Sequence, residues 1–140
     1  MAGVRHFREL VCWQLARELQ REVFKITSKN EFNRNVDLRN ELRDAASSAR
    51  RNIAEGFKRR THRDTANFLS VSIASINEVE DELGEALDNG YVTSKEIDRA
   101  LNFCKRASVA TSRFRNSIKN KPDPSWNRWK AHTRCKHRDN

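Results

Sequence analysis

The sequence predicts an all-α protein, an up-down-up-down antiparallel four-helix bundle. Residues that break helices are scarce, with four glycines and two prolines among 140 residues, and both prolines lie near the C-terminal end. Four segments repeat apolar residues at the spacing of amphipathic helices. Short connections between them favour antiparallel neighbours. We therefore expect a bundle over residues 1–120 and a separate tail over residues 121–140.

The first predicted helix covers residues 6–28 and the second covers residues 37–60. The polar stretch 29–35 separates them. The middle of the second helix is rich in alanine, and small side chains let a neighbouring helix approach closely. Gly56 interrupts this helix, and close packing is the simplest reason for a glycine there. The two apolar stripes contain Phe7, Leu10, Leu15, Leu19, Val23 and Ile26, then Leu38, Leu42, Ala45, Ala46, Ala49, Ile53 and Phe57.

The third predicted helix covers residues 62–88 and the fourth covers residues 94–119. Thr61 and Asp64 have the spacing of a capping box, although Asp replaces the usual Glu or Gln. Asn89-Gly90 predicts the end of the third helix, because glycine readily adopts a left-handed conformation. Thr93 and Glu96 predict a second capping box at the start of the fourth helix.

The composition is strongly basic, with a net charge of +9 and an isoelectric point near 10.0. A basic balance favours polyanionic partners such as nucleic acid, an anionic membrane or an acidic protein. No apolar run is long enough to span a bilayer, and the first residues lack the apolar core of a signal peptide. Three scattered cysteines indicate no disulfide framework. We therefore expect a cytoplasmic protein without a membrane partner.

Negative charge is concentrated in the third predicted helix. Residues 61–92 contain one basic and seven acidic residues, whereas the rest of the chain is basic. Acidic side chains near a helix C-terminus interact unfavourably with the helix dipole, which a nearby basic surface would offset. Two interpretations stay open, a solvated acidic face or a contact with a basic surface of another subunit. The cluster consists of Glu78, Glu80, Asp81, Glu82, Glu85 and Asp88.

A basic run at the end of the second helix is the main candidate for binding nucleic acid. Glu55 has the spacing to pair with Arg51 and with Arg59. The remaining cations could neutralise several phosphates, which gives binding that weakens steeply with salt. A charged, solvated helix face with local ion pairs is the alternative. The candidate residues are Arg50, Arg51, Lys58, Arg59, Arg60 and Arg63.

The tail over residues 121–140 combines cations with two tryptophans. Aromatic rings between cations suit single-stranded nucleic acid, through base stacking and phosphate neutralisation, although an unstructured basic tail looks the same. The candidate residues are Trp126, Arg128, Trp129 and Lys130. His132, Cys135 and His137 lie close together, but a fourth ligand at standard spacing is missing. We therefore predict no metal site.

The sequence also contains no pattern typical of an enzyme. It has no glycine-rich phosphate loop, no nucleophile elbow and no zinc-protease motif. The four histidines fall at the ends of predicted helices or in the tail, not in the middle of a bundle helix. We therefore expect no catalysis, no cofactor and no small-molecule substrate.

Several motifs in order resemble those of the bacterial four-helix bundle proteins encoded in 23S ribosomal RNA intervening sequences. The opening signature matches FRELVCWQLA at residues 7–16, and the strongest motif matches LRDAASSARRNIAEG at residues 42–56. Phe68-Leu69 with ASINEV at residues 74–79 resembles the third-helix pattern, and Gly90-Tyr91-Val92 the following turn. The resemblance covers about residues 6–118. Ala49-Arg50-Arg51 departs from it, because the family usually has a small residue or proline before Asn-Ile-Ala-Glu-Gly.

This resemblance implies an assembly and a class of partner. Members of the family form ring-like homopentamers, and related accessory proteins of diversity-generating retroelements hold a reverse transcriptase and its template RNA. The leading hypothesis is therefore a non-catalytic homo-oligomeric scaffold, with a pentamer favoured, that binds RNA or a nucleoprotein. The resemblance also implies a reverse transcriptase as a protein partner. The alternative is a structural module for protein–protein interaction with no role in nucleic-acid binding.

Overall fold

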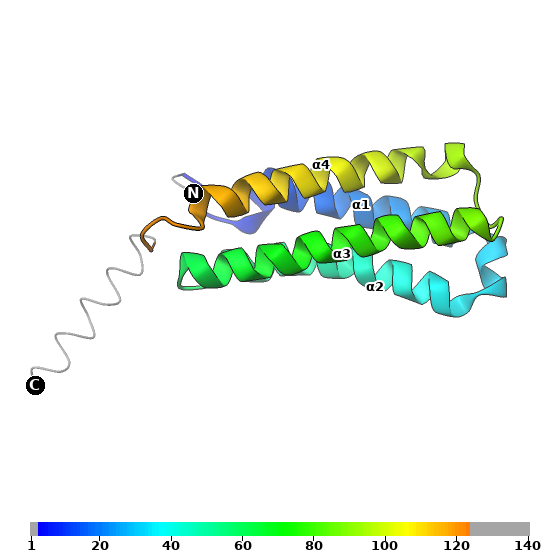
Figure 1. The fold of residues 1–140 in the computed structure, drawn as a ribbon, viewed down its shortest axis with the longest axis horizontal. Helices are drawn as coiled ribbons and strands as arrows, with labels where there is room; N and C mark the ends of the chain where they lie inside the picture. The colour runs from blue at the N-terminus through cyan, green and yellow to red at the C-terminus, as the bar shows by residue number, and fades with distance from the viewer. Residues whose placement is uncertain (1–2, 124–140) are drawn as a thin grey trace, which may run out of the picture.

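The computed structural model describes residues 3–123, which form four α-helices and two short 3-10 helices without any strand (Figure 1). The predicted all-α class is therefore confirmed for this part of the chain. The elements are η1 (Phe7–Glu9), α1 (Val11–Thr27), η2 (Asn30–Arg34), α2 (Val36–Phe57), α3 (His62–Asp88) and α4 (Ser94–Ile118).

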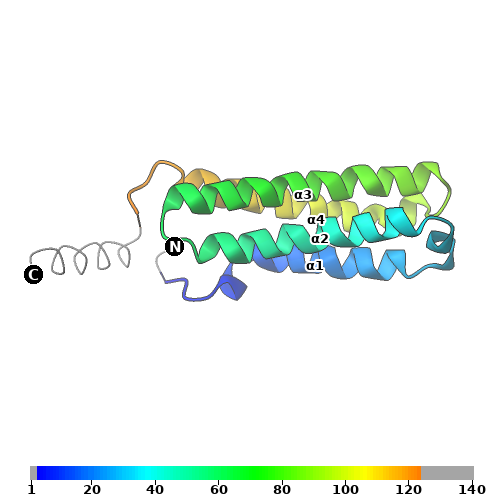
Figure 2. The same cartoon turned by 90° about the horizontal axis from the view of Figure 1, so that it is seen from below.

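Each long helix packs extensively on two others. Helix α1 contacts α2 and α4, and α3 contacts the same two helices, so α1 and α3 lie diagonally across the bundle. Figures 1 and 2 show the α1–α2 and α3–α4 connections at one end of the molecule. The α2–α3 connection lies at the other end, together with η1 and the end of α4.

The first helix begins five residues later than predicted, at Val11 and not at residue 6. The earlier residues form η1, and His6 and Glu9 form a capping box at its N-terminus. The Glu9 carboxylate accepts the backbone N–H of Arg5 at 2.7 Å and that of His6 at 3.2 Å. Leu10 then takes an extended conformation, which places its side chain in the core with 7% exposed and interrupts the helix.

The segment between α1 and α2 is more than a polar break. It forms η2, and its Phe32 side chain is fully buried against the ring of Tyr91, with ring centroids 5.6 Å apart. The Lys29 ammonium group donates to the Tyr91 carbonyl at 3.1 Å and pairs with Glu96. Helix α2 then starts at Val36, where the Asn35 side chain accepts the Leu38 N–H.

The α2–α3 connection covers residues 58–61 and is longer than predicted, because α2 ends at Phe57 and not at residue 60. The Lys58 and Arg59 N–H groups bond to the carbonyls of Glu55 and Gly56, which tightens the last turn. Thr61 caps α3 by accepting the Asp64 N–H at 3.1 Å, without the reciprocal half of a capping box. The predicted box of Thr93 and Glu96 is confirmed at the start of α4.

The closest packing in the bundle joins α2 to α3. Ala45, Ala46 and Ala49 are almost completely buried there. The Ser72 hydroxyl donates to the Ala49 carbonyl at 2.7 Å, which requires the two helix backbones to lie very near each other. Closer to the connection, the Thr65 hydroxyl donates to the Gly56 carbonyl at 2.8 Å.

Gly56 permits this approach, and the predicted close packing at Gly56 is confirmed. A Cβ atom at this position would lie 2.9 Å from the Cβ of Phe68 and 3.3 Å from the Thr65 carbonyl oxygen. Gly90 has a different role at the other end of α3. Its φ of 76° ends the helix in the left-handed conformation, as Asn89-Gly90 predicted.

The bundle interior is mainly aliphatic and also holds two cysteines. Cys12 and Cys104 are buried, in agreement with a role as small apolar side chains. Burial raises the pKa of the Cys12 thiol to about 11 and that of Cys104 to about 12. Both thiols are therefore protonated at neutral pH, which makes them poor nucleophiles and poor metal ligands.

Glu82 is an exception to the apolar interior. Glu82 is 6% exposed, and its Oε2 atom has no hydrogen-bond partner in the described part of the chain. Burial raises the pKa of this carboxyl to about 7, and repulsion from Glu78, Glu41, Glu85 and Asp81 adds to the effect. The bundle therefore favours the neutral acid at this position.

Substitutions at two helical glycines should have opposite effects on stability. We expect Gly56→Ala to lower the free energy of unfolding by about 1 kcal/mol, because overpacking outweighs the gain in helix propensity. Gly84→Ala should raise it by up to about 1 kcal/mol, because no atom lies within 4 Å of the added methyl group. Urea unfolding at one protein concentration measures both. A stabilised Gly56→Ala variant would contradict the packing described here.

The stability of the protein should depend on the protonation of Glu82. The pKa of this carboxyl is raised from 4.5 to about 7 on folding, so the folded state holds its proton over this interval. The contribution of Glu82 to unfolding free energy should then fall as the pH rises from 4.5 to about 7. Glu82→Gln should remove this fall and be more stable than the parent at pH 8. Urea unfolding of the parent, of Glu82→Gln and of the exposed control Glu31→Gln across this pH range measures the difference. Parallel curves of unfolding free energy against pH for the parent and Glu82→Gln would refute the prediction.

Candidate nucleic-acid interface

The structure divides the predicted basic run among different surfaces. Arg50 is half-buried and faces α1, whereas the next residue, Arg51, is exposed. Arg60 is exposed in the α2–α3 connection, and Arg63 is exposed in the first turn of α3. The six predicted residues therefore do not form one continuous patch.

Two of the six cations are engaged in packing. The Arg59 guanidinium group pairs with Glu55, as predicted, and lies 4.4 Å from the centre of the Phe68 ring. The Lys58 ammonium group lies 5.5 Å from the centre of the Phe7 ring. The predicted pair of Glu55 with Arg51 is not among the contacts of residues 3–123. These contacts leave Lys58 and Arg59 less free to bind a ligand.

Three of the predicted arginines are exposed and form no ion pair with the described residues: Arg51, Arg60 and Arg63. We call these three residues the connection patch. The last described residues lie close to it, because Asp123 accepts the backbone N–H of His62 at 3.0 Å and the Lys121 carbonyl contacts the His62 ring. The predicted tail residues Trp126, Arg128, Trp129 and Lys130 lie outside the described residues.

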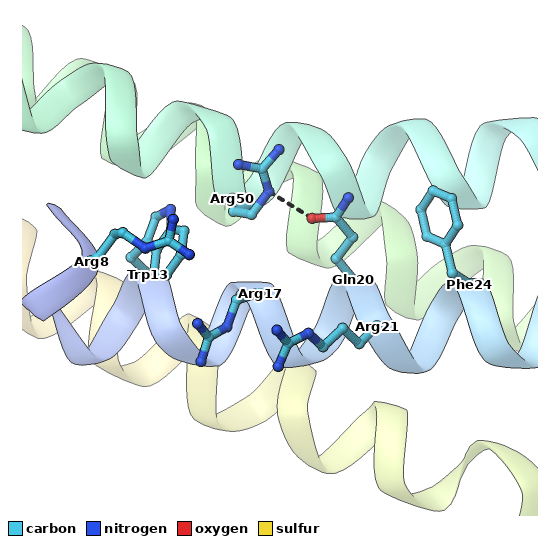
Figure 3. Close-up of a pocket in the computed structure, with 7 residues that line it drawn as sticks. All are labelled: Arg8, Trp13, Arg17, Gln20, Arg21, Phe24 and Arg50. Atoms are coloured by element: carbon cyan, nitrogen blue, oxygen red, sulfur yellow. Dashed lines mark hydrogen bonds between the residues drawn. The ribbon is translucent and has the colours of Figure 1, made fainter.

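A second basic surface lies in a groove between α1 and α2, with a volume of about 360 Å³. We call it the arginine groove. Figure 3 shows Arg8 beside the Trp13 ring and Arg50 reaching from α2 towards Gln20 on α1. The residues that line the groove are Arg8, Trp13, Arg17, Gln20, Arg21, Phe24 and Arg50.

Hydrogen bonds and ring contacts position the side chains of the groove. The Arg50 Nε donates to the Gln20 Oε1 at 2.6 Å, and the Gln20 amide group donates to the Ser47 hydroxyl at 3.1 Å. The guanidinium carbons of Arg8 and Arg17 lie 5.0 and 5.2 Å from the centre of the Trp13 ring. Arg50 is therefore fixed by polar contacts, whereas Arg8 and Arg17 are held by cation–π contacts.

The arginine groove carries excess positive charge. Glu18 is the carboxylate that pairs with its arginines, at 2.8 Å from Arg21 and 3.5 Å from Arg17. Within residues 3–123, Arg8 and Arg50 form no ion pair. One carboxylate thus pairs with two of the four guanidinium groups, and the remaining positive charge makes the groove attractive to anions.

The sequence carried a partial signal for this groove. Trp13, Arg17 and Arg21 are spaced four residues apart, so they follow one face of α1. Arg8 and Arg50 were not predictable in the same way. Arg8 reaches the groove through η1, which precedes the helix, and Arg50 comes from another helix.

The acidic residues predicted on the third helix form a separate surface on α3, diagonally across the bundle from α1. Glu80, Asp81, Glu85 and Asp88 are exposed and line an open groove of about 510 Å³ with Gly84 at its centre. Glu82, in contrast, is buried. Acidic and basic surfaces are therefore segregated on different helices.

The described residues also bear on metal and membrane binding. Residues 3–123 hold no group of three or more histidine, cysteine or acidic side chains arranged to hold a metal ion. His132, Cys135 and His137 fall outside this part of the chain. None of the helices described in residues 3–123 combines the length and the apolar character needed to cross a bilayer.

Comparison with known protein families confirms the resemblance that the sequence motifs indicated. The model of one protein family, the 23S rRNA-intervening sequence protein family, matches residues 8–112. Comparison with curated proteins finds no match. The matched region runs from η1 well into α4 and includes the arginine groove and the connection patch. The chain belongs to the 23S rRNA-intervening sequence protein family.

Proposed function

We propose that this protein is a non-catalytic, homo-oligomeric scaffold that binds RNA or a nucleoprotein through its basic surfaces. The observation that carries the proposal is the connection patch, where Arg51, Arg60 and Arg63 are exposed and unneutralised within the described residues. A polyanion that contacts these arginines releases its condensed counterions, which provides a favourable free energy of binding. The net charge of +9 on the chain adds long-range attraction.

The assembly that we propose is an up-down-up-down bundle that forms a ring-like homopentamer in the cytoplasm. Membership of the family supports this proposal. A ring repeats each basic surface around its axis, so several weak contacts with one RNA act together and raise the overall affinity. A reverse transcriptase of a diversity-generating retroelement is a possible protein partner by the same resemblance.

Neutralising the connection patch should weaken RNA binding and its dependence on salt. For the variant Arg51→Gln with Arg60→Gln and Arg63→Gln, we expect the slope of log K against log salt to fall by about 2, since a single strand loses about 0.7 per phosphate contact. Fluorescence anisotropy with a labelled oligoribonucleotide between 50 and 300 mM salt, over which the Debye length shortens from roughly 14 Å to roughly 6 Å, measures this slope.

A matched control removes three exposed cations from α4, through Lys95→Gln, Lys105→Gln and Arg113→Gln. Both variants lose the same net charge, so a specific role for the patch predicts a smaller effect in the control. Equal slopes in the patch variant and the parent would remove the connection patch from the RNA interface.

A second candidate function is a protein–protein interaction module, which the acidic groove on α3 favours. Exposed carboxylates of Glu80, Asp81, Glu85 and Asp88 line that groove. A basic surface on another protein, or on another copy of this chain, would offset this negative charge. In this case the charges would serve subunit contacts and not nucleic acid.

Reversing charge on α3 should disperse the oligomer if the acidic surface forms subunit contacts. Glu78 and Glu85 are exposed, so Glu78→Lys with Glu85→Lys leaves the buried Glu82 in place. We expect a lower mass by size-exclusion chromatography with light scattering, because like charges across an interface repel. Glu31→Lys with Asp98→Lys is the control at exposed positions elsewhere. An unchanged mass in the α3 variant would exclude α3 from the contact.

A further inference from the structure

We propose that the arginine groove between α1 and α2 binds consecutive phosphates of a single RNA strand. This inference rests on the proposed RNA-binding function and assigns its main contact to a surface other than the connection patch. The groove gathers four arginines from η1, α1 and α2, whereas one carboxylate, Glu18, pairs with them in the described part of the chain.

The arrangement of Arg50 prepares it to bind an anion. Its Nε is used by Gln20, and Gln20 is in turn held by Ser47, so the guanidinium plane is fixed before a ligand arrives. The terminal nitrogens of Arg50 make no hydrogen bond within residues 3–123. A fixed guanidinium group with free terminal N–H groups matches the paired oxygens of a phosphate, at a reduced loss of side-chain entropy.

Two further donors of the groove lack acceptors. The indole N–H of Trp13 is buried and has no hydrogen-bond partner in the described part of the chain, and the same is true of the Arg17 Nε. Trp13 as a whole is only 3% exposed. Buried donors without partners are rare and unfavourable. Both are donors and neither is an acceptor, so a ligand that engages them brings oxygen atoms that accept hydrogen bonds, as phosphate does.

The length of the groove favours a strand over a single phosphate group. On α1 it extends from Trp13 to Phe24, which is about 16 Å along the helix axis. Arg17 and Arg21 are one helical turn apart, about 6 Å along the axis. A single phosphate group reaches only part of this row, whereas a chain of phosphates contacts all of it.

The groove also offers an aromatic surface for a base. Phe24 lies at its end and is 39% exposed, and the Arg43 guanidinium group covers one face of the ring at 4.9 Å. Bases of single-stranded RNA stack on aromatic rings and on guanidinium planes.

A local readout of the groove is available through Trp13. The chain has three tryptophans, so the full-length Trp126→Phe and Trp129→Phe parent leaves Trp13 as its only one. Titration of this parent with an unlabelled 12-nucleotide oligouridylate at 50 mM salt should change the emission of Trp13. Anisotropy with the labelled oligouridylate measures overall affinity in parallel.

In that parent, Arg21→Gln with Arg50→Gln should abolish the emission change and raise Kd roughly tenfold or more. The salt slope should fall by about 1.4, which corresponds to two lost contacts with a single strand. Lys105→Gln with Arg113→Gln on α4 is the control of equal charge loss. Arg21→Gln alone, at a side chain that is 62% exposed, preserves the fold and should lower the slope by about 0.7.

The outcomes separate the groove from the proposed function. Oligouridylate binding that leaves Trp13 emission unchanged, together with a groove variant that binds like the α4 control, overturns the groove assignment and leaves RNA binding standing. An emission change with ATP or pyrophosphate but not with oligouridylate overturns the assignment to an RNA strand. An unsubstituted chain that binds no labelled oligouridylate at 50 mM salt overturns both proposals.

Discussion

The near contact of the α2 and α3 backbones is the constraint on which the rest of the bundle depends. Gly56 has no Cβ to meet Phe68, and Ser72 bonds directly to the Ala49 carbonyl. Larger side chains at these positions would push the helices apart and open the core. The same contact brings the end of α2 to the start of α3, so the connection is short. Arg60 in the connection and Arg63 in the first turn of α3 consequently lie at the same end of the bundle.

Helical periodicity was enough to predict the four long helices, because each buries one apolar stripe. It did not reveal the break at Leu10, since the capping of η1 by Glu9 depends on local hydrogen bonds. It also missed Phe32, a single apolar residue in a polar stretch that the end of the bundle buries. Periodicity also did not separate Arg50 from Arg51. Successive residues of a helix are rotated by about 100°, so these adjacent arginines lie on different faces of α2.

The separation of charge within the bundle follows from the same geometry. Helices α1 and α3 lie diagonally across from each other. Helix α1 lines the arginine groove, and α3 carries the acidic groove. Acidic residues near the C-terminal end of α3 oppose its dipole, and burial of Glu82 adds a further unfavourable term. A polyanion approaching the molecule is therefore repelled from α3 and attracted towards α1 and α2, which orients it before contact.

The arginine groove holds two of the buried polar groups that lack a hydrogen-bond partner in the described part of the chain, the Trp13 indole N–H and the Arg17 Nε. A phenylalanine in place of Trp13 would fill similar space without a buried N–H group that lacks an acceptor. Lysine in place of Arg17 would lack the planar guanidinium group that lies 5.2 Å from the centre of the Trp13 ring. Natural sequences accept such local conflicts mainly where function requires them. Because the unmatched groups in this groove are donors and cations, the requirement that best accounts for them is an anion rich in oxygen atoms.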